Sequence, residues 1–166
     1  MLPKNWPKNI KYTNEVIIKD IQDPPKSFLD GVIIQEITNP DHILFGEYGL
    51  LSRRRWEPFE VIGEYCGVLC DGYSDSKYIA TLHRDVSDEE ALAIDAQYYG
   101  NETRFINDYR NISDKPNTQL VSCNIEGHQK ILIVVTEVIN PYTEILLDYG
   151  DDYWEFFKTL RISKQD

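Results

Sequence analysis

Hydrophobic and polar positions alternate along much of the chain, in short runs separated by glycine, proline and asparagine. The clearest run is HQKILIVVTEVI, residues 128–139, which is rich in the β-branched residues that strands favour. Asn140-Pro141 follows it and forces a turn. Similar runs recur at residues 31–38, 59–69, 77–82 and 144–150. We predict a strand in each run, and therefore a mainly β fold of several short, folded-over sheets.

Helical patterns are few and short. Ser87 and Glu90 have the spacing of a capping box and predict a helical start ahead of ALAI, residues 91–94. Asn101 is expected to cap a short helix that runs through Phe105. The segment DDYWEFFKTLRI, residues 151–162, has helical spacing of its apolar residues and acids at its start, so it predicts a helix.

Length and composition indicate one domain. A chain of 166 residues with 42% hydrophobic residues can bury a single core. We expect an N-terminal extension that packs on the domain edge, the domain itself, and a C-terminal aromatic helix or tail, over residues 1–30, 31–154 and 155–166. Gly63 and Gly67 suggest bulges or close backbone approach.

The formal net charge of -11 disfavours nucleic acid and favours a cationic partner. The run Arg53 to Arg55 is interpreted as solvated loop charge rather than a basic patch. No apolar run is long enough for a membrane span and the start lacks the core of a signal peptide, so an intracellular protein is expected. Cys66 and Cys70 lack a second pair and are interpreted as core thiols, with no metal site.

Hydrolytic chemistry has no visible basis in the sequence. The histidines at positions 42, 83 and 128 lie in separate polar contexts and are interpreted as surface residues. No nucleophile elbow, phosphate loop or zinc-protease motif is present. What remains is a set of aromatic and glycine-containing stretches: GEYGLLS (46–52), IGEYCG (62–67), GNETRFIND (100–108) and LLDYGDDYW (147–154).

These stretches resemble the SET-domain protein lysine methyltransferases, most closely the histone H3 branch, without its flanking zinc-binding cysteine clusters. The family pattern appears in order as Gly46 and Gly49, Glu64-Tyr65-Cys66-Gly67, Gly100 to Asp108, Pro116-Asn117, and Asp148-Tyr149-Gly150. The resemblance implies a SET fold in which the R-F-I-N segment is threaded beneath a loop made by the C-terminal strand. Such a pseudoknot would place that segment beside Tyr149.

The resemblance also implies roles for individual residues and S-adenosylmethionine as cofactor. Tyr149 is expected to be the principal catalytic tyrosine, with Tyr65 as the second catalytic residue. The expected cofactor-binding residues are Glu47, Tyr48, Gly49, Arg104, Phe105, Asn107, Asp108, Tyr149 and Trp154. The expected lysine-binding residues are Tyr65, Tyr78, Tyr109 and Leu147. For Arg104 and Phe105, the sequence favours a packing role and direct contact with the ligand equally.

The function implied is methyl transfer to a lysine of a basic protein, with a histone tail as the natural guess and another lysine-rich protein as the runner-up. The alternative is a catalytically inactive SET-fold module that binds a basic partner. The nucleus is expected before the cytoplasm. Asp108 stands where the family usually has histidine, and Leu147 stands where many members carry an aromatic residue. The smaller Leu147 favours more than monomethylation.

Overall fold

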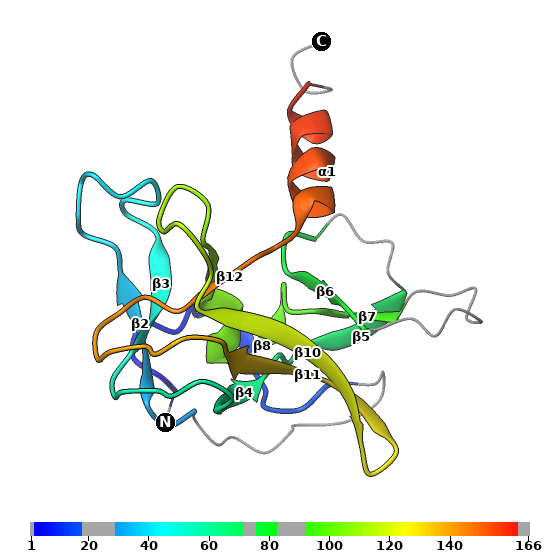
Figure 1. Cartoon of the computed structure of the whole chain (residues 1–166). Helices are drawn as coiled ribbons and strands as arrows, with labels where there is room; N and C mark the ends of the chain where they lie inside the picture. Colours follow the sequence, from blue (N-terminus) through cyan, green and yellow to red (C-terminus); the bar gives the residue numbers. More distant parts are fainter. Residues whose placement is uncertain (1, 18–28, 72–75, 83–91, 163–166) are drawn as a thin grey trace.

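The computed structural model describes residues 2–17, 29–71, 76–82 and 92–162, with side chains described as far as Phe156 in the C-terminal helix (Figure 1). In this part of the chain, short strands predominate and helices are few. In chain order the elements are β1 (Lys11–Tyr12), β2 (Val32–Glu36), β3 (Tyr48–Ser52), β4 (Val61–Glu64), β5 (Val68–Asp71), β6 (Ile79–Thr81), β7 (Leu92–Asp95), β8 (Tyr99–Gly100), the 3₁₀ helix η1 (Glu102–Phe105), β9 (Asn107–Asp108), β10 (Thr118–Ile125), β11 (His128–Val135), β12 (Leu146–Leu147) and α1 (Asp151–Ile162).

The strands form several small sheets rather than one large sheet. Antiparallel sheets have the orders β10-β11-β4, β2-β3 and β5-β7-β6, and two parallel pairs join β1 to β8 and β12 to β9. The long β10–β11 hairpin crosses the front of the molecule in Figure 1. The predicted mainly β fold of several short sheets is confirmed.

The alternation of hydrophobic and polar residues correctly located most of these strands. Tertiary contacts decided where each strand begins and ends. The run at residues 59–69 divides into β4 and β5, because the chain bends between Glu64 and Val68. At Gly67 an added Cβ would lie 2.4 Å from the carbonyl oxygen of Asp95. This confirms the close backbone approach predicted for that glycine.

The helical prediction is wrong for residues 92–94, and residue 91 lies outside the described residues. Leu92–Asp95 is strand β7, which pairs with β5 on one side and β6 on the other. The proposed capping residues Ser87 and Glu90 lie outside the described residues. Pairing on both edges supplies backbone hydrogen bonds that local sequence cannot reveal, and the sheet therefore decides the conformation.

The central core contains fully buried aliphatic side chains from several of the sheets and from the segments that follow β11. They are Ile34, Leu50, Ile94, Ile131, Ile133, Val135, Ile139 and Ile145. Cys66 is completely buried, as expected for a core thiol, and burial raises its pKa. Near the N-terminus, Trp6 packs edge-on against Tyr12 and Phe105, with ring centroids 5.0 and 5.7 Å away. These contacts attach the first residues of the chain to the helix η1.

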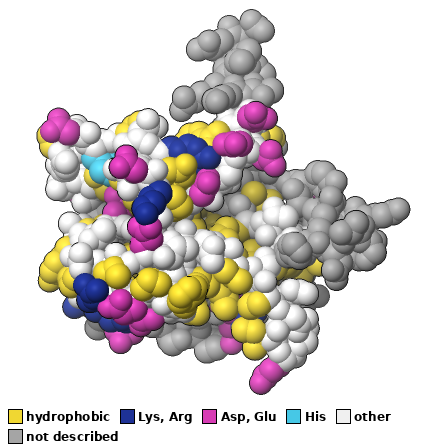
Figure 2. Space-filling view, viewed as in Figure 1, with side chains coloured by type: hydrophobic (Ala, Val, Ile, Leu, Met, Phe, Trp, Pro, Cys, Tyr) yellow, Lys and Arg dark blue, Asp and Glu magenta, His cyan; other side chains and the backbone are white. Residues whose placement is uncertain are grey.

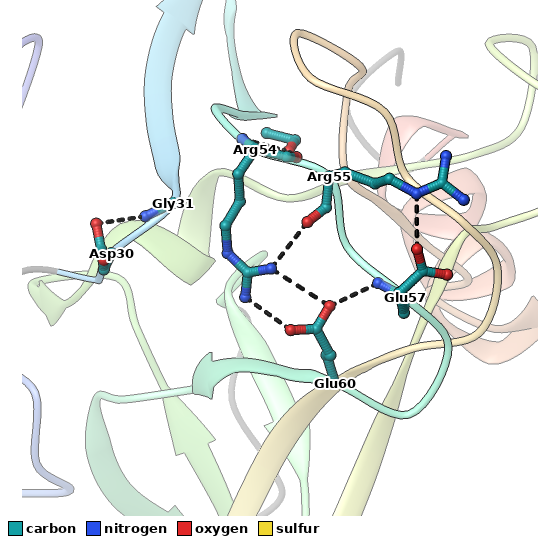
Figure 3. Close-up of polar contacts among 7 residues, drawn as sticks. Asp30, Gly31, Arg54, Arg55, Glu57 and Glu60 are labelled. Atoms are coloured by element: carbon teal, nitrogen blue, oxygen red, sulfur yellow. Dashed lines mark hydrogen bonds and ion pairs between the residues drawn. The ribbon is translucent and has the colours of Figure 1, made fainter.

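Two of the three arginines in the basic run at Arg53 to Arg55, namely Arg54 and Arg55, are paired with nearby carboxylates (Figure 3). Arg54 forms hydrogen bonds with both carboxylate oxygens of Glu60, and Arg55 pairs with Glu57 at 2.6 Å. The Arg54 guanidinium also lies 3.4 Å from the centre of the Trp56 ring. These exposed pairs leave no concentrated positive charge for a phosphate backbone to bind.

Helix α1 begins at Asp151, with residues 148–150 between it and the end of strand β12 at Leu147, and projects away from the sheets in Figure 1. Its limits agree with the predicted helix at residues 151–162. In the part of the chain that the structure describes, no helix has the length and apolar character needed to cross a membrane.

Candidate active site

Two segments that are distant in sequence meet at the centre of the site. Strand β12 pairs in parallel with β9, which places Leu146 opposite Asn107 and Leu147 opposite Asp108. Asn117 fastens the same segment, since its amide Nδ2 donates to the Glu144 carbonyl and its Oδ1 accepts from Leu146 N, both at 2.8 Å. The R-F-I-N segment and the D-Y-G segment therefore lie side by side.

The R-F-I-N segment begins with the capped helix predicted at Asn101. The Asn101 side chain accepts a hydrogen bond from Thr103 N at 3.2 Å, and its Nδ2 donates to the Glu64 carbonyl at 2.8 Å. All of helix η1 is buried. This anchoring explains how so short a helix keeps Ile106 and Asn107 in fixed positions.

A tyrosine-rich cavity lies against this junction. Tyr65 follows β4, Tyr78 precedes β6, and Tyr149 follows β12, so three remote segments supply its aromatic wall. Leu147, buried to 4% exposure, also contributes to the wall. The complete lining consists of Tyr65, Lys77, Tyr78, Ile79, Ala80, Thr103, Arg104, Ile106, Leu120, Leu147, Tyr149 and Tyr153.

Both central tyrosine hydroxyls are held by backbone carbonyls. Tyr65 Oη donates to the Tyr78 carbonyl at 2.8 Å, and Tyr149 Oη donates to the Ile106 carbonyl at 2.5 Å. Burial raises the pKa of each phenol, so both remain neutral at physiological pH. Each oxygen keeps its lone pairs for accepting a hydrogen bond. These tyrosines are suited to orienting a donor rather than to removing a proton.

Arg104 lies in the cavity wall, and its side chain is largely buried, with 7% of the residue exposed. Its Nε donates to the Ala96 carbonyl at 3.0 Å, and its guanidinium stacks 4.1 Å from the centre of the Tyr78 ring. No carboxylate pairs with Arg104 among the described residues. The cavity therefore has a fixed positive charge in its wall.

Other predicted site residues lie outside this cavity. Tyr109 does not line it, contrary to the suggestion that it completes the lysine tunnel, because its ring instead faces the Arg110 guanidinium at 5.2 Å. Phe105 points the other way and packs on Trp6. Trp154 is 36% exposed on helix α1 and contacts the ring of Tyr153.

A second cluster lies beside the cavity, around Asn107 and Gly49. The Asn107 amide Nδ2 donates to the Tyr48 carbonyl at 3.2 Å and to Glu144 Oε1 at 2.9 Å. A Cβ at Gly49 would lie 2.7 Å from Glu144 Oε1 and 3.3 Å from Asn107 Nδ2. Because only glycine leaves this space open, the backbone of β3 can lie close to the amide. The side chains of Glu47 and Tyr48 are exposed.

His42 was interpreted as a surface histidine, and the structure corrects this. Its Nε2 lies 3.1 Å from Glu144 Oε2, and its side chain is only 16% exposed. Neither His42 nor Glu144 was a candidate on sequence grounds, because they are separated by about 100 residues. The contact joins the loop before β3 to the segment before β12.

Asp108 is buried beneath Tyr149 and is paired with Arg110. One oxygen of Asp108 accepts from Tyr149 N at 2.8 Å and from Arg110 Nη1 at 2.9 Å. Arg110 also reaches Asp148 at 2.7 Å and Asp151 at 3.0 Å. Burial alone would raise the pKa of Asp148, but hydrogen bonds from Gly150 N and Arg110 outweigh it and lower that pKa.

Arg110 and Tyr153 are further residues of the site that the sequence did not indicate. Arg110 follows Asp108 by two positions, which is a usable signal for a pair, whereas its other acidic partners come from the far end of the domain. Tyr153 reaches the cavity from helix α1 and packs on Tyr149, with ring centroids 4.8 Å apart. From this aromatic segment, only Trp154 was among the residues expected at the site.

Comparison with known proteins agrees with this arrangement. Residues 47–150 match the SET domain. The chain is 27% identical over 113 residues to the human histone-lysine N-methyltransferase EHMT1, covering 65% of this chain and 9% of that protein. It is 28% identical over 114 residues to histone-lysine N-methyltransferase ASHH1 of Arabidopsis thaliana, covering 64% of this chain and 22% of that protein. The chain thus spans less than a quarter of either relative.

Solved structures show the same fold. ATXR5, solved in complex with histone H3.1 mono-methylated on R26, superposes with a TM-score of 0.58 at 18% identity, over 73% of this chain and 57% of that one. The polycomb repressive complex 2 of Chaetomium thermophilum superposes with a TM-score of 0.59 at 22% identity, over 73% of this chain and 15% of that one. The fold predicted from the motifs is confirmed, and this chain belongs to the SET-domain family.

Proposed function

We propose that this domain transfers methyl groups from S-adenosylmethionine to the side-chain amine of a lysine in a basic protein. The observation that carries this proposal is the meeting of Tyr65, Tyr149 and Leu147 in one cavity. Membership of the SET-domain family and the naming of both relatives as histone-lysine N-methyltransferases support it.

The cavity suits a lysine side chain that has lost its proton. A lysine ammonium in water has a pKa near 10.4, so the amine must shed a proton to solvent before it can attack. Apolar surroundings and a nearby positive charge both disfavour the ammonium form. The buried Arg104 guanidinium supplies such a charge. The neutral oxygens of Tyr65 and Tyr149 can then accept hydrogen bonds from the amine and orient its lone pair.

The residues beside β9 fit the cofactor. The absence of a side chain at Gly49 lets the Glu144 carboxylate and the Asn107 amide lie against the backbone of β3, and Asn107 presents its side-chain amide there. S-adenosylmethionine supplies, when bound, a methyl group on a positively charged sulfonium. We propose that the backbone of Glu47, Tyr48 and Gly49 and the residues Asn107 and Asp108 hold it, with Trp154 towards the adenine. Arg104 and Phe105 support these residues by packing.

In our proposal, the chain's part in the reaction is to orient the lysine amine relative to the methyl group. With the cofactor bound, the lysine nitrogen would take the methyl group in a single displacement that releases the sulfur as a thioether, so this chain would need to supply no covalent nucleophile. Alignment of the two reactants can contribute about 7 kcal/mol or more to lowering the barrier. In our proposal the hydroxyl of Tyr149, fixed by the Ile106 carbonyl, provides this alignment.

A histone tail is the proposed substrate, and the nucleus is the proposed site of action. Acidic side chains gather at the base of helix α1 (Figure 2), from Asp148, Asp151, Asp152 and Glu155, and the first two share the single guanidinium of Arg110. Together with the net charge of -11, they would attract a lysine-rich peptide. The histone H3.1 bound to ATXR5 is consistent with a substrate of this kind.

Incubation with radiolabelled S-adenosylmethionine and a panel of intact histones and other lysine-rich proteins tests the function. The proposal predicts label in at least one basic protein, and loss of label with Tyr149→Phe. Cofactor binding measured by calorimetry without transfer to any protein in the panel would instead support the inactive binding module. Absence of both binding and transfer would contradict the proposed enzyme.

A further inference from the structure

The amide of Asn107 has a defined orientation. Its Nδ2 lies within hydrogen-bond distance of the Tyr48 carbonyl, at 3.2 Å, and of Glu144 Oε1, at 2.9 Å. A carbonyl and a carboxylate can only accept, so the NH₂ group must face them. The carbonyl oxygen Oδ1 of Asn107 therefore points the other way. Within the described part of the chain, no hydrogen-bond donor reaches this oxygen, and it is not among the buried side-chain atoms that lack a partner.

The carboxylate of Glu144 is itself held by a second side chain, His42. His42 Nδ1 accepts a hydrogen bond from Leu44 N at 3.1 Å, so in the neutral ring the proton is on Nε2. That nitrogen donates to Glu144 Oε2 at 3.1 Å. The side chains of His42 and Glu144 are only 16% and 15% exposed. Each carboxylate oxygen of Glu144 thus has its own donor, in a sheltered position where hydrogen bonds strengthen one another.

Gly49 makes room for this arrangement. Any side chain at position 49 would place its Cβ 2.7 Å from Glu144 Oε1, which is too close for a real contact. The glycine therefore allows Glu144 to reach Asn107 directly beneath strand β3. The cluster of His42, Glu144, Asn107 and Gly49 is a continuous unit that ends in one outward-facing acceptor.

We propose that Glu144, supported by His42, is a positioning residue that fixes the Asn107 amide with its oxygen towards the cofactor. The outward Oδ1 accepts a hydrogen bond from the ammonium group in the methionine half of S-adenosylmethionine. The carboxylate of Glu144 adds a favourable field for that cation. This inference rests on the proposed function, which already assigns Asn107 to the cofactor, and adds Glu144 and His42 as residues that act on the cofactor through Asn107.

Calorimetric titration with two probes tests the proposal. S-adenosylhomocysteine carries the ammonium group, whereas 5′-methylthioadenosine lacks the whole amino-acid half. Glu144→Gln replaces one acceptor by a donor and permits Asn107 to turn over. We expect this variant to bind S-adenosylhomocysteine about tenfold more weakly or worse, since a hydrogen bond to a charged group is lost. Its affinity for 5′-methylthioadenosine should remain within about twofold of the unsubstituted chain.

Two further variants exclude a simple folding effect. His42→Ala should also weaken the binding of S-adenosylhomocysteine and leave that of 5′-methylthioadenosine unchanged, but the effect should be smaller than that of Glu144→Gln. Combining Asn107→Ala with Glu144→Gln should weaken binding little beyond Asn107→Ala alone, because both act on the same contact. Glu57→Gln, at an exposed carboxylate paired with Arg55, is the matched control and should change neither affinity.

The possible results of these titrations distinguish the positioning role from its alternatives. Unchanged affinity of Glu144→Gln for S-adenosylhomocysteine would overturn the proposal, and so would equal weakening of both probes, which indicates a general effect on the loop. If the unsubstituted chain binds neither probe, the proposed cofactor is wrong and this inference fails with it. Weakening that is confined to S-adenosylhomocysteine supports the positioning role.

Discussion

The main-chain N–H of Tyr149 donates a hydrogen bond to the buried carboxylate of Asp108 at 2.8 Å. The same carboxylate oxygen accepts from Arg110, which also holds Asp148 and Asp151. The backbone of the proposed catalytic tyrosine is thereby joined to β9 and to the start of helix α1. Asp108, which stands where the family usually has histidine, is thus one of three carboxylates that share the Arg110 guanidinium.

Replacing Arg110 by glutamine should weaken this cluster. Asp108 would remain buried without its countercharge, so we expect the free energy of unfolding to fall by about 1–3 kcal/mol. Because Tyr149 would lose its fixed support, turnover should fall more than cofactor affinity. Urea unfolding and steady-state kinetics measure the two effects. The control Arg55→Gln removes an exposed pair and should cost no more than about 0.5 kcal/mol; an equally small effect at Arg110 would contradict the structural role.

The Tyr149 hydroxyl should be needed for turnover but not for folding. Tyr149→Phe removes the oxygen that faces the cavity and leaves the ring packed against Tyr153. We expect kcat to fall about a hundredfold, while the Kd for S-adenosylmethionine stays within about twofold. Tyr98→Phe, at an exposed ring, is the control. Unchanged kcat for Tyr149→Phe would refute the role assigned to its hydroxyl.

Leu147 should set how many methyl groups the cavity accepts. It lies in the cavity wall with 4% exposure, so a larger side chain there must take space from the substrate amine. We expect the unsubstituted chain to add more than one methyl group and Leu147→Phe to stop at monomethylation. Mass spectrometry of the product at saturation measures this. Leu92→Phe, on an exposed face of β7, should leave the product distribution unchanged; monomethylation by the unsubstituted chain would disprove the expectation.

Glu102 should make stability depend on pH. Burial raises its pKa above 4.5, although hydrogen bonds from Tyr12 Oη at 2.7 Å and Leu29 N at 3.2 Å act in the opposite direction. The folded chain therefore binds this proton more tightly than the unfolded chain does. The associated stability is present below the unfolded pKa and is lost as pH rises through the folded pKa.

Glu102→Gln mimics the protonated form and removes this dependence. The difference in Tm, variant minus unsubstituted chain, should become more positive as pH rises from about 4 to about 7. Thermal unfolding across that range measures it. Glu60→Gln is the control of opposite sign, because hydrogen bonds from Arg54 lower the pKa of Glu60. A Tm difference for Glu102→Gln that does not change with pH would show that this proton is not linked to folding.

Local pattern was sufficient wherever local interactions decide the structure. Alternation located the strands at residues 31–38 and 128–139, and side-chain chemistry identified the cap at Asn101. The spacing and charge of residues 151–162 predicted helix α1. The order of the motifs around Gly49, Tyr65, Asn107 and Tyr149 identified the family and hence the fold. These features depend on neighbouring residues or on a motif that the sequence itself contains.

The tertiary structure decided which distant residues contact one another. Pairing on both edges made residues 92–95 a strand, and the parallel contact of β9 with β12 placed Asp108 against the backbone N–H of Tyr149. The cavity received Tyr153 in place of Tyr109. Glu144 contacts His42 and Asn107, which lie far away in the chain, and nothing local in the sequence indicates these contacts. The physical reason is that burial and hydrogen bonding depend on which segments meet, and residue type alone does not specify that.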